Sequence, residues 1–248
     1  MLVCKILPHE RADGPENMAL DEALLDAAAE SPGLAFFRTY EWTEPTLSLG
    51  YFQSISQAES DPRWGHVAIV RRPTGGGAIW HHHEVTYALV LPVSHPSARR
   101  GGTLYHEVHA AIAQTFLAQG IPVKRRGQTA APEAHDRPFL CFQDRDAEDL
   151  VLTGSKVVGS AQRRRAGAVL QHGSILLAHS PTTPELPGAA DLAGAPTEKK
   201  GWSDRLRETL PIALGLQPES IAVSAANRQH ARDLAEQVYR TTAWNRRR

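Results

Sequence analysis

The sequence has little cysteine, no net charge and no long apolar run. Its two cysteines, Cys4 and Cys141, cannot form the disulfide framework of a small secreted domain and suit a reducing compartment. Lysine plus arginine and aspartate plus glutamate number 27 each, so no bulk charge attracts nucleic acid or a membrane surface. No apolar run approaches the roughly 18 to 20 residues of a membrane span, and the N-terminus lacks a signal-peptide pattern. We therefore expect a cytoplasmic protein with no nucleic-acid or membrane partner.

The rest of the composition is ordinary for a globular protein. Hydrophobic residues make up 42% and charged residues 22% of the 248 residues, which is enough chain to bury a full core. The basic residues nevertheless gather in runs at residues 124–126, 163–165 and 246–248. Runs of this kind are usually solvated surface.

Short β-branched or alternating runs, separated by glycine and proline, predict strands that come mainly in adjacent pairs. Apolar stripes at helical spacing predict helices before and after them, with Asn17 and Thr103 as N-caps. This order favours an α+β fold, a mixed and largely antiparallel sheet with helices packed on one face. The expected strands are residues 1–7, 34–40, 46–50, 67–70, 84–91, 168–177 and a hairpin over 150–159; the expected helices are 18–30, 104–119, 203–214 and 227–240; residues 124–138 and 180–201 are expected loops.

The most informative stretch is the glycine-rich segment Arg71–His81, between the strands expected at 67–70 and 84–91. Three consecutive glycines, Gly75 to Gly77, are entropically costly, but they permit positive φ and the close approach of another molecule to backbone N–H groups. Arg72, at the mouth of this loop, could hold a carboxylate or phosphate with its guanidinium. An ordinary glycine-rich hairpin is the alternative. We interpret the loop as a binding site for a group with a negative or carbonyl end.

Cys141 and Lys156 are the candidate reactive pair. A cysteine is nucleophilic only as the thiolate, and a nearby ammonium group favours that form. A predicted hairpin lies within the fifteen residues between them, so adjacency is compatible with the sequence but is not established by it. The alternative for Cys141 is a small buried hydrophobe, which is also how we interpret Cys4.

Three consecutive histidines, His81 to His83, suggest a metal site at first sight. Successive strand residues point to opposite faces, and no further ligand follows at metal spacing, so we expect no metal here. His81 follows the glycine loop most closely and is the one expected to point into the site. His172 is either a core histidine or a second group of the site. Neither a phosphate-binding P-loop nor a G-x-S-x-G elbow is present.

Four stretches together resemble the biotin/lipoate protein ligase superfamily, and specifically its lipoate branch. The resemblance runs over about residues 1 to 180 and is carried by Asn17–Leu25, Arg71–His81, Lys156–Gln162 and Gln171–Ile175. It implies one α+β catalytic domain over 1–248, with a core at about 1–180, a loop at 181–201 and a C-terminal helical part at 202–248. In such a domain the glycine loop and the lysine line a tunnel for an eight-carbon acyl chain.

Within the lipoate branch, a cysteine fifteen residues before the lysine is similar to the cysteine-dependent octanoyltransferases. In those enzymes the cysteine takes octanoate from acyl carrier protein as a thioester, and the acyl group passes to a lysine of a lipoyl domain or of glycine cleavage H protein. The resemblance therefore implies Cys141 and Lys156 as catalytic residues and no cofactor. The substrate-binding residues it implies are Arg72, Thr74, Gly75, Gly76, Gly77, Ala78, His81, Gly159, Ser160, His172 and Gly173. The basic runs are then candidates for docking an acidic carrier protein.

The chain departs from the family pattern at two places. The family commonly has Pro-Ser-x-Tyr-Glu soon after the cysteine, where this chain has residues 144–148 with three acids, and an aspartate after the loop histidine, where it has His82. Three other activities therefore stay open beside the octanoyltransferase. They are an ATP-dependent lipoate–protein ligase, an amidotransferase that moves the acyl group between carrier proteins, and a non-catalytic protein that only binds an acylated or biotinylated ligand.

Overall fold

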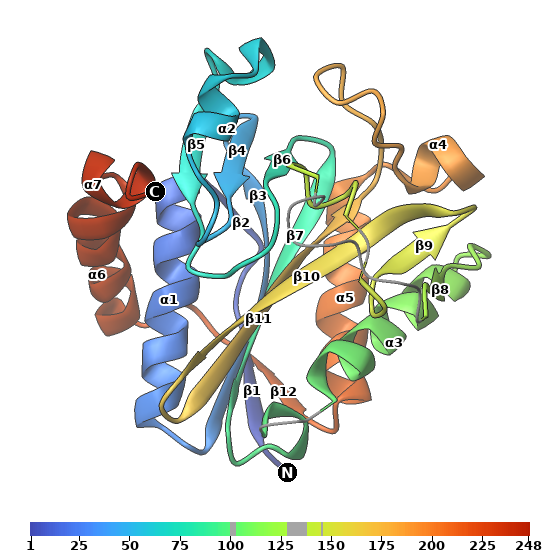
Figure 1. Cartoon of the computed structure of the whole chain (residues 1–248). Helices are drawn as coiled ribbons and strands as arrows, with labels where there is room; N and C mark the ends of the chain where they lie inside the picture. The colour runs from blue at the N-terminus through green and yellow to red at the C-terminus, as the bar shows by residue number, and fades with distance from the viewer. Residues whose placement is uncertain (100–102, 128–137, 145) are drawn as a thin grey trace.

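The computed structural model describes residues 1–99, 103–127, 138–144 and 146–248. Its main sheet joins nine strands of this described chain in the order β12-β1-β3-β7-β11-β10-β9-β8, with β2 beside β3 (Figure 1). β1 runs parallel to β12 and β3, β2 runs parallel to β3, and the remaining pairs are antiparallel. The predicted mixed, largely antiparallel α+β fold is confirmed. The strands are β1 (Val3–Ile6), β2 (Glu10–Ala12), β3 (Leu34–Trp42), β7 (Glu84–Pro92), β8 (Lys124–Arg125), β9 (Leu150–Leu152), β10 (Ser155–Arg165), β11 (Ala168–Leu176) and β12 (Gln217–Ser220).

A smaller sheet carries the glycine loop. Its strands are β4 (Thr46–Leu49), β5 (Ala68–Arg71) and β6 (Ile79–His81), in the order β5-β4-β6. β4 pairs in parallel with β5 and antiparallel with β6. The glycine loop therefore joins two strands that lie on either side of β4, and the interpretation as a simple hairpin is wrong.

Helices cover both faces of the main sheet, so the prediction of helices on one face is wrong. One apolar cluster packs α1 (Gly14–Glu30) against Phe36 and Ala88, and the other packs α3 (Leu104–Leu117) and α5 (Lys199–Ala213) against Phe37 and Tyr87. Successive strand residues point to opposite faces, and here both faces are apolar. The other helices are α2 (Ser56–Glu59), α4 (Ala189–Ala193), α6 (Ala225–Leu234), which continues as a π-helical turn Ala235–Tyr239, and α7 (Thr242–Asn245).

α1 begins four residues earlier than predicted. Its N-cap is Asp13, whose side chain accepts from the Glu16 backbone N–H, and Pro15 occupies the first turn. Asn17 is not a cap but a buried connector. Its side-chain amide donates to the carbonyls of Ala12 and Glu41, and its oxygen accepts from Arg38. The predicted apolar face of this helix is confirmed, with Met18, Leu20, Leu24, Leu25 and Ala28 all buried.

The C-terminal part adds an edge strand as well as helices. β12 pairs in parallel with β1, and α6 lies against α1 (Figure 1). β12 is Gln-Pro-Glu-Ser and fully exposed, so its sequence has no apolar pattern from which a strand could be predicted. The predicted loop at 180–201 contains α4 and the first turn of α5. The predicted loop at 124–138 contains β8, while its residues 128–137 lie outside the described chain.

No helix in the described ranges has both the length and the apolarity that crossing a membrane requires.

Gly50 gives a direct test of how closely the glycine loop packs. A Cβ at Gly50 would lie 1.9 Å from the Gly76 carbonyl oxygen, whereas a Cβ at Gly33 would meet nothing within 4 Å. We expect Gly50→Ala to lower the free energy of unfolding by about 1–3 kcal/mol through overpacking, and the control Gly33→Ala to change it by less than about 0.5 kcal/mol. Urea unfolding of both variants measures this. Equal midpoints for the two variants would contradict the packing described.

Candidate active site

The structure brings Cys141 and Lys156 together. The Nζ of Lys156, at the start of β10, lies 3.5 Å from the Cys141 Sγ and 3.0 Å from the Cys141 carbonyl oxygen. Cys141 lies in a turn after a one-residue bridge between Leu140 and Ala78, and its side chain is partly exposed. A thiol in contact with an ammonium group is the arrangement that favours the thiolate.

The glycine loop fixes the position of the cysteine. The Ala78 N–H donates to the Phe139 carbonyl at 2.8 Å, and the Cys141 N–H donates to the Ala78 carbonyl at 2.8 Å. A Cβ at Gly77 would lie 2.9 Å from the Cys141 backbone nitrogen and 3.0 Å from the Phe139 oxygen. The last glycine of the triplet is therefore required for contact with the cysteine segment of this same chain.

Lys156 is buried against Asp149. The Nζ lies 3.0 Å from the Asp149 Oδ2, and each side chain is only 5% exposed. Burial alone would lower the pKa of Lys156, but the charges of Cys141 and Asp149 outweigh it and raise that pKa above its usual value. Burial raises the pKa of Asp149, against the opposing effect of Lys156. A Cβ at Gly159 would lie 2.5 Å from the Lys156 Cε, so the glycine provides the space that the lysine occupies.

Arg72 holds the glycine loop from inside. Its Nη1 donates to the carbonyl and hydroxyl oxygens of Ser48, and its Nη2 donates to the carbonyls of Gly75 and Gly77. These terminal nitrogens are thus engaged by the protein itself. The buried Nε–H has no acceptor among the described residues and is the one donor left for a bound group.

His81 and Glu84 extend the Arg72 network. Ser48 accepts from Arg72 and contacts the His81 Nε2 at 2.6 Å, while the His81 Nδ1 contacts the Glu84 carboxylate. The His81 ring stacks on Trp42 at a centroid distance of 3.8 Å. Burial lowers the pKa of His81 in spite of the nearby carboxylate, which favours the neutral ring.

His172 anchors the other side of the loop. Its Nδ1 lies 2.9 Å from the Asp21 carboxylate, and its Nε2 lies 2.7 Å from the Thr74 hydroxyl. Because the Asp21 carboxylate can only accept, the Nδ1 of His172 donates to it. Asp21 is completely buried and also accepts from the Tyr40 hydroxyl. His172 is buried, and it lies in the lining of the cavity beside Cys141.

A small, mainly apolar cavity lies beside Cys141. Predicted residues that line it are Arg72, Gly76, His81, Cys141, Gly159, Ser160, His172 and Gly173; the others are Met18, Tyr40, Trp42, Ile79, Thr86, Ala161 and Ser174. The other predicted residues do not line the cavity but contact its lining residues or Cys141. They are Thr74, Gly75, Gly77, Ala78 and Lys156. Strand periodicity could have found some of the missed residues, because Tyr40 and Trp42 share one face of β3, and Gly159 and Ala161 share one face of β10.

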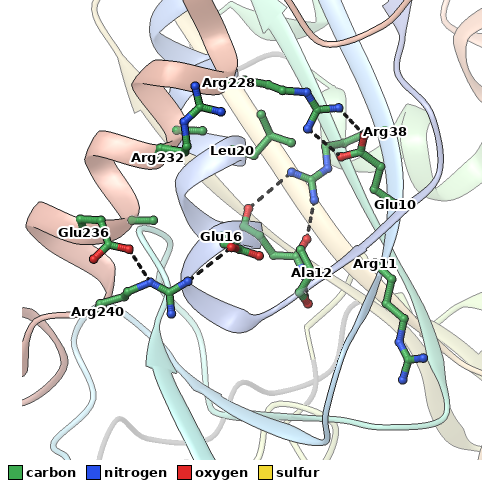
Figure 2. A pocket seen from close by; sticks show the side chains of 13 residues that line it. Glu10, Arg11, Ala12, Glu16, Leu20, Arg38, Arg228, Arg232, Glu236 and Arg240 are labelled. Carbon is green, nitrogen blue, oxygen red and sulfur yellow. Dashed lines mark hydrogen bonds and ion pairs between the residues drawn. The ribbon is translucent and has the colours of Figure 1, made fainter. Parts of the chain in front are cut away.

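A wider groove lies away from the cysteine, between β2, the start of α1, and α6 (Figure 2). Two of the five arginines that line it pair with acids of the same groove. Arg228 pairs with Glu10, and Arg240 pairs with Glu16 and Glu236. The groove contains no cysteine or histidine, so the chemistry that the sequence indicates lies in the smaller cavity.

His109 is a buried group beside the cavity that the sequence reasoning missed. Its Nε2 lies 2.5 Å from the Ser160 hydroxyl, its Nδ1 lies 2.5 Å from the Glu148 carbonyl, and Tyr87 contacts the same hydroxyl at 2.5 Å. The carbonyl requires a proton on Nδ1, so Ser160 donates to Nε2 and accepts from Tyr87. Burial lowers the pKa of His109 to about 4. His109 is buried on α3 but lies beside the predicted apolar stripe of that helix, because successive helical residues point in different directions.

The three adjacent histidines do not form one site. His82 and His83 stack on each other at 3.7 Å, and the His82 Nδ1 contacts the Ser180 hydroxyl. Among the residues whose placement is described, no group of three or more His, Cys, Asp or Glu side chains could hold a metal ion.

Comparison with known proteins gives consistent matches. The model of the lipoyl protein ligase A/B catalytic domain matches residues 13–185. "Octanoyltransferase LipM" of Carboxydothermus hydrogenoformans is 40% identical over 178 residues, covering 70% of this chain and 64% of that relative, so the chain spans less than two thirds of its length. The protein of the same name from Kyrpidia tusciae is 31% identical, with 99% of each covered.

Solved structures confirm the fold. A lipoate-protein ligase A structure bound with ATP has a TM-score of 0.78 at 20% identity and covers 99% of each chain. A Thermoplasma acidophilum putative lipoate protein ligase with bound lipoic acid has a TM-score of 0.76 at 18% identity, with 100% of each covered.

The depressed pKa of His109 predicts a pH-dependent stability. A histidine titrates near 6.5 when unfolded and at about 4 here, so the unfolded chain binds more protons between these values. The contribution of His109 to the free energy of unfolding is therefore complete above about pH 6.5 and is lost as the pH falls toward 4. We expect this contribution to the free energy of unfolding to be about 2 kcal/mol smaller at pH 5 than at pH 7.5.

The variant His109→Gln isolates this effect, because glutamine does not titrate in that range. The measurement is urea unfolding of both proteins at pH 5 and 7.5. The wild type should lose more stability than the variant by the stated amount. Parallel losses in the two proteins would show that His109 does not change its protonation differently in the folded and unfolded states.

Proposed function

The chain belongs to the lipoyl protein ligase A/B catalytic-domain family, and from this premise we propose that it is an octanoyl-[acyl carrier protein]:protein N-octanoyltransferase of lipoate biosynthesis. The observation that carries the proposal is the contact of the Lys156 ammonium with the Cys141 sulfur, beside a mainly apolar cavity that Cys141 itself lines. We also propose that residues 1–248 form one catalytic domain, acting in the cytoplasm without a cofactor.

In the first step, the Cys141 thiolate attacks the carbonyl carbon of octanoyl-acyl carrier protein. The bond from that carbon to the donor sulfur breaks, the donor leaves as a thiol after taking up a proton, and a Cys141 thioester remains. Lys156 stabilises the thiolate before attack and the negative charge on the carbonyl oxygen during it, an electrostatic role of the oxyanion type. Asp149 holds the ammonium group in place.

The cavity then receives the acyl chain. Its apolar wall is supplied by Met18, Tyr40, Trp42 and Ile79. Apolar walls of this kind bind an alkyl chain by removing it from water. His81 and His172 hold the glycine loop on the side of the cavity that faces Cys141.

In the second step, the unprotonated amine of an acceptor lysine attacks the Cys141 thioester. An amide forms, the Cys141 thiol is released, and the amine proton passes to solvent or to the thiolate. A thioester is a high-energy acyl donor relative to an amide, so this step needs no ATP. The proposed acceptor is a lipoyl domain or glycine cleavage H protein. The names of the curated relatives support the octanoyl donor, and a solved relative described with its E2 lipoyl domain supports the acceptor class.

Intact mass spectrometry tests the thioester route. Incubation with octanoyl-acyl carrier protein should add one octanoyl group to the wild type, removable by hydroxylamine, and none to Cys141→Ala. The control is Cys4→Ala, since Cys4 is buried and burial raises its pKa to about 12, and this variant should still accept the group. Modification of an acceptor domain only with ATP and free lipoate would instead indicate a ligase. Transfer only from an octanoylated or lipoylated carrier protein would indicate an amidotransferase, and no reaction with either donor would indicate a binding protein.

The proposed role of Lys156 predicts a separate kinetic result. Replacing it alone would leave Asp149 as an uncompensated buried carboxylate, so the comparison is Asp149→Asn against the double variant Asp149→Asn/Lys156→Met. We expect the double variant to be acylated about 10² to 10³-fold more slowly, as for loss of an oxyanion-stabilising group. Rapid-quench acylation measures this, with the unfolding midpoint as a check on folding. Equal acylation rates would exclude a catalytic role for the ammonium group.

A further inference from the structure

Two arginine runs that are far apart in sequence meet on the loop after β4. The guanidinium of Arg163, on β10, lies 5.2 Å from the centroid of the Tyr51 ring. Arg247 lies 4.3 Å from the same ring, and Arg248 lies 5.2 Å from the ring of Phe52. We call these five residues the arginine–aromatic patch.

The three arginines of the patch differ from their neighbours in how their charge is balanced. Arg165 forms ion pairs with Glu22 and Asp26, and Arg246 forms one with Glu59. In the part of the chain that the structure describes, no ion pair to a carboxylate is found for Arg163, Arg247 or Arg248. They contact aromatic rings instead, which stabilises a cation without neutralising it.

A fourth cation lies beneath the patch. Arg71 is completely buried and donates to the carbonyls of Gly50, Gln53 and Asn245, which ties the loop to the C-terminal helix. Burial and the charges of Arg247 and Arg248 both lower the pKa of Arg71. Like charges are thus held together here, although they repel one another. Such an arrangement is favourable when an acidic partner covers it.

The patch is connected to the cysteine segment. Gln53 follows Phe52 directly, and its side chain accepts from the Gly50 N–H and donates to the Phe139 carbonyl, two residues before Cys141. A Cβ at Gly75 would lie 3.8 Å from the Phe52 ring, which is itself 69% exposed. Gly76 and Cys141 both line the cavity. A molecule bound to the patch therefore lies beside the glycine loop.

We propose that the arginine–aromatic patch docks the donor, an acidic carrier protein that presents its acyl group on a phosphate-bearing arm; this rests on the proposed function. Arginine pairs well with phosphate and carboxylate groups, and the exposed Phe52 adds an apolar contact at the centre. The acceptor offers a lysine, a cation that three unneutralised arginines would repel. The charge of the patch therefore favours the donor over the acceptor as its occupant.

The test compares two donors in single-turnover acylation of Cys141, followed by mass spectrometry. One is octanoyl-acyl carrier protein; the other is octanoyl-N-acetylcysteamine, a small thioester without protein or phosphate. For Arg247→Gln/Arg248→Gln we expect kcat/KM with the carrier protein to fall roughly tenfold and its salt dependence to weaken, while the small donor reacts within about twofold of the wild-type rate. The single variant Arg163→Gln should show the same split, more weakly.

The matched control is Arg205→Gln/Arg232→Gln, which removes two exposed arginines from α5 and α6 and should change neither donor. An equal loss with both donors would overturn the proposal, because it would indicate a structural or catalytic effect. An unchanged rate with the carrier protein would overturn it as well, and so would an effect confined to transfer to the acceptor. A wild type that reacts with the carrier protein while the arginine variants keep its full rate would contradict the docking surface alone. A wild type acylated by the small donor but not by the carrier protein would contradict the donor named in the proposed function, and the docking surface with it. Failure with both donors would contradict the proposed function.

Discussion

The geometry of the site depends on the short backbone pairing between Ala78 and the segment Phe139–Cys141. Its two hydrogen bonds, each 2.8 Å long, place the cysteine sulfur within reach of Lys156. The pairing is possible only because residue 77 has no side chain. The other side of the glycine loop is then fixed by Arg72, which holds its carbonyls, and by Thr74, which contacts His172. A loop of glycines is thus made rigid by its surroundings, which is how a flexible sequence can position a reactive group.

The electrostatics of the site follow from burial. A lysine that is 5% exposed would tend to lose its proton, and Asp149 together with the cysteine reverses that tendency. Asp149 directly follows residues 144–148, the segment that departs from the family pattern. The acids of that segment would by themselves disfavour a thiolate at Cys141, but the next residue is the counter-ion that helps to keep Lys156 charged. Glu148, the last residue of the segment, accepts from His109 through its backbone carbonyl, which ties that end of the segment to the site.

Predictions from the sequence are confirmed where hydrophobic periodicity and local residue chemistry indicate the same element. The strands β3, β7 and β11 and the apolar faces of α1 and α3 are of this kind. The pairing of Cys141 with Lys156 was implied only by the family resemblance, because the spacing of the two residues leaves their distance open. Predictions from the sequence are wrong or missing where contacts between distant parts of the chain determine the structure. β12 is a polar strand that forms because β1 offers it an edge, and Asn17 is engaged by Arg38 and two carbonyls from residues that only folding brings near. The pairing of β5 and β6 on either side of β4 is also non-local. Asp149 and His109 escaped notice because a buried charge or imidazole has no sequence signature until its partner is known.

Three buried histidines around the cavity show how one residue type can link separate segments of the chain. His81, His109 and His172 each join two segments through both ring nitrogens: Ser48 to Glu84, Ser160 to Glu148, and Thr74 to Asp21. An imidazole can donate and accept at once without carrying charge, and burial favours that neutral form at His81 and His109. Lysine or arginine in these positions would add a charge beside Lys156 and weaken its preference for the protonated state. His81 and His109 therefore connect segments around the cavity without adding charge, and the Lys156 ammonium group is the cation in contact with the sulfur.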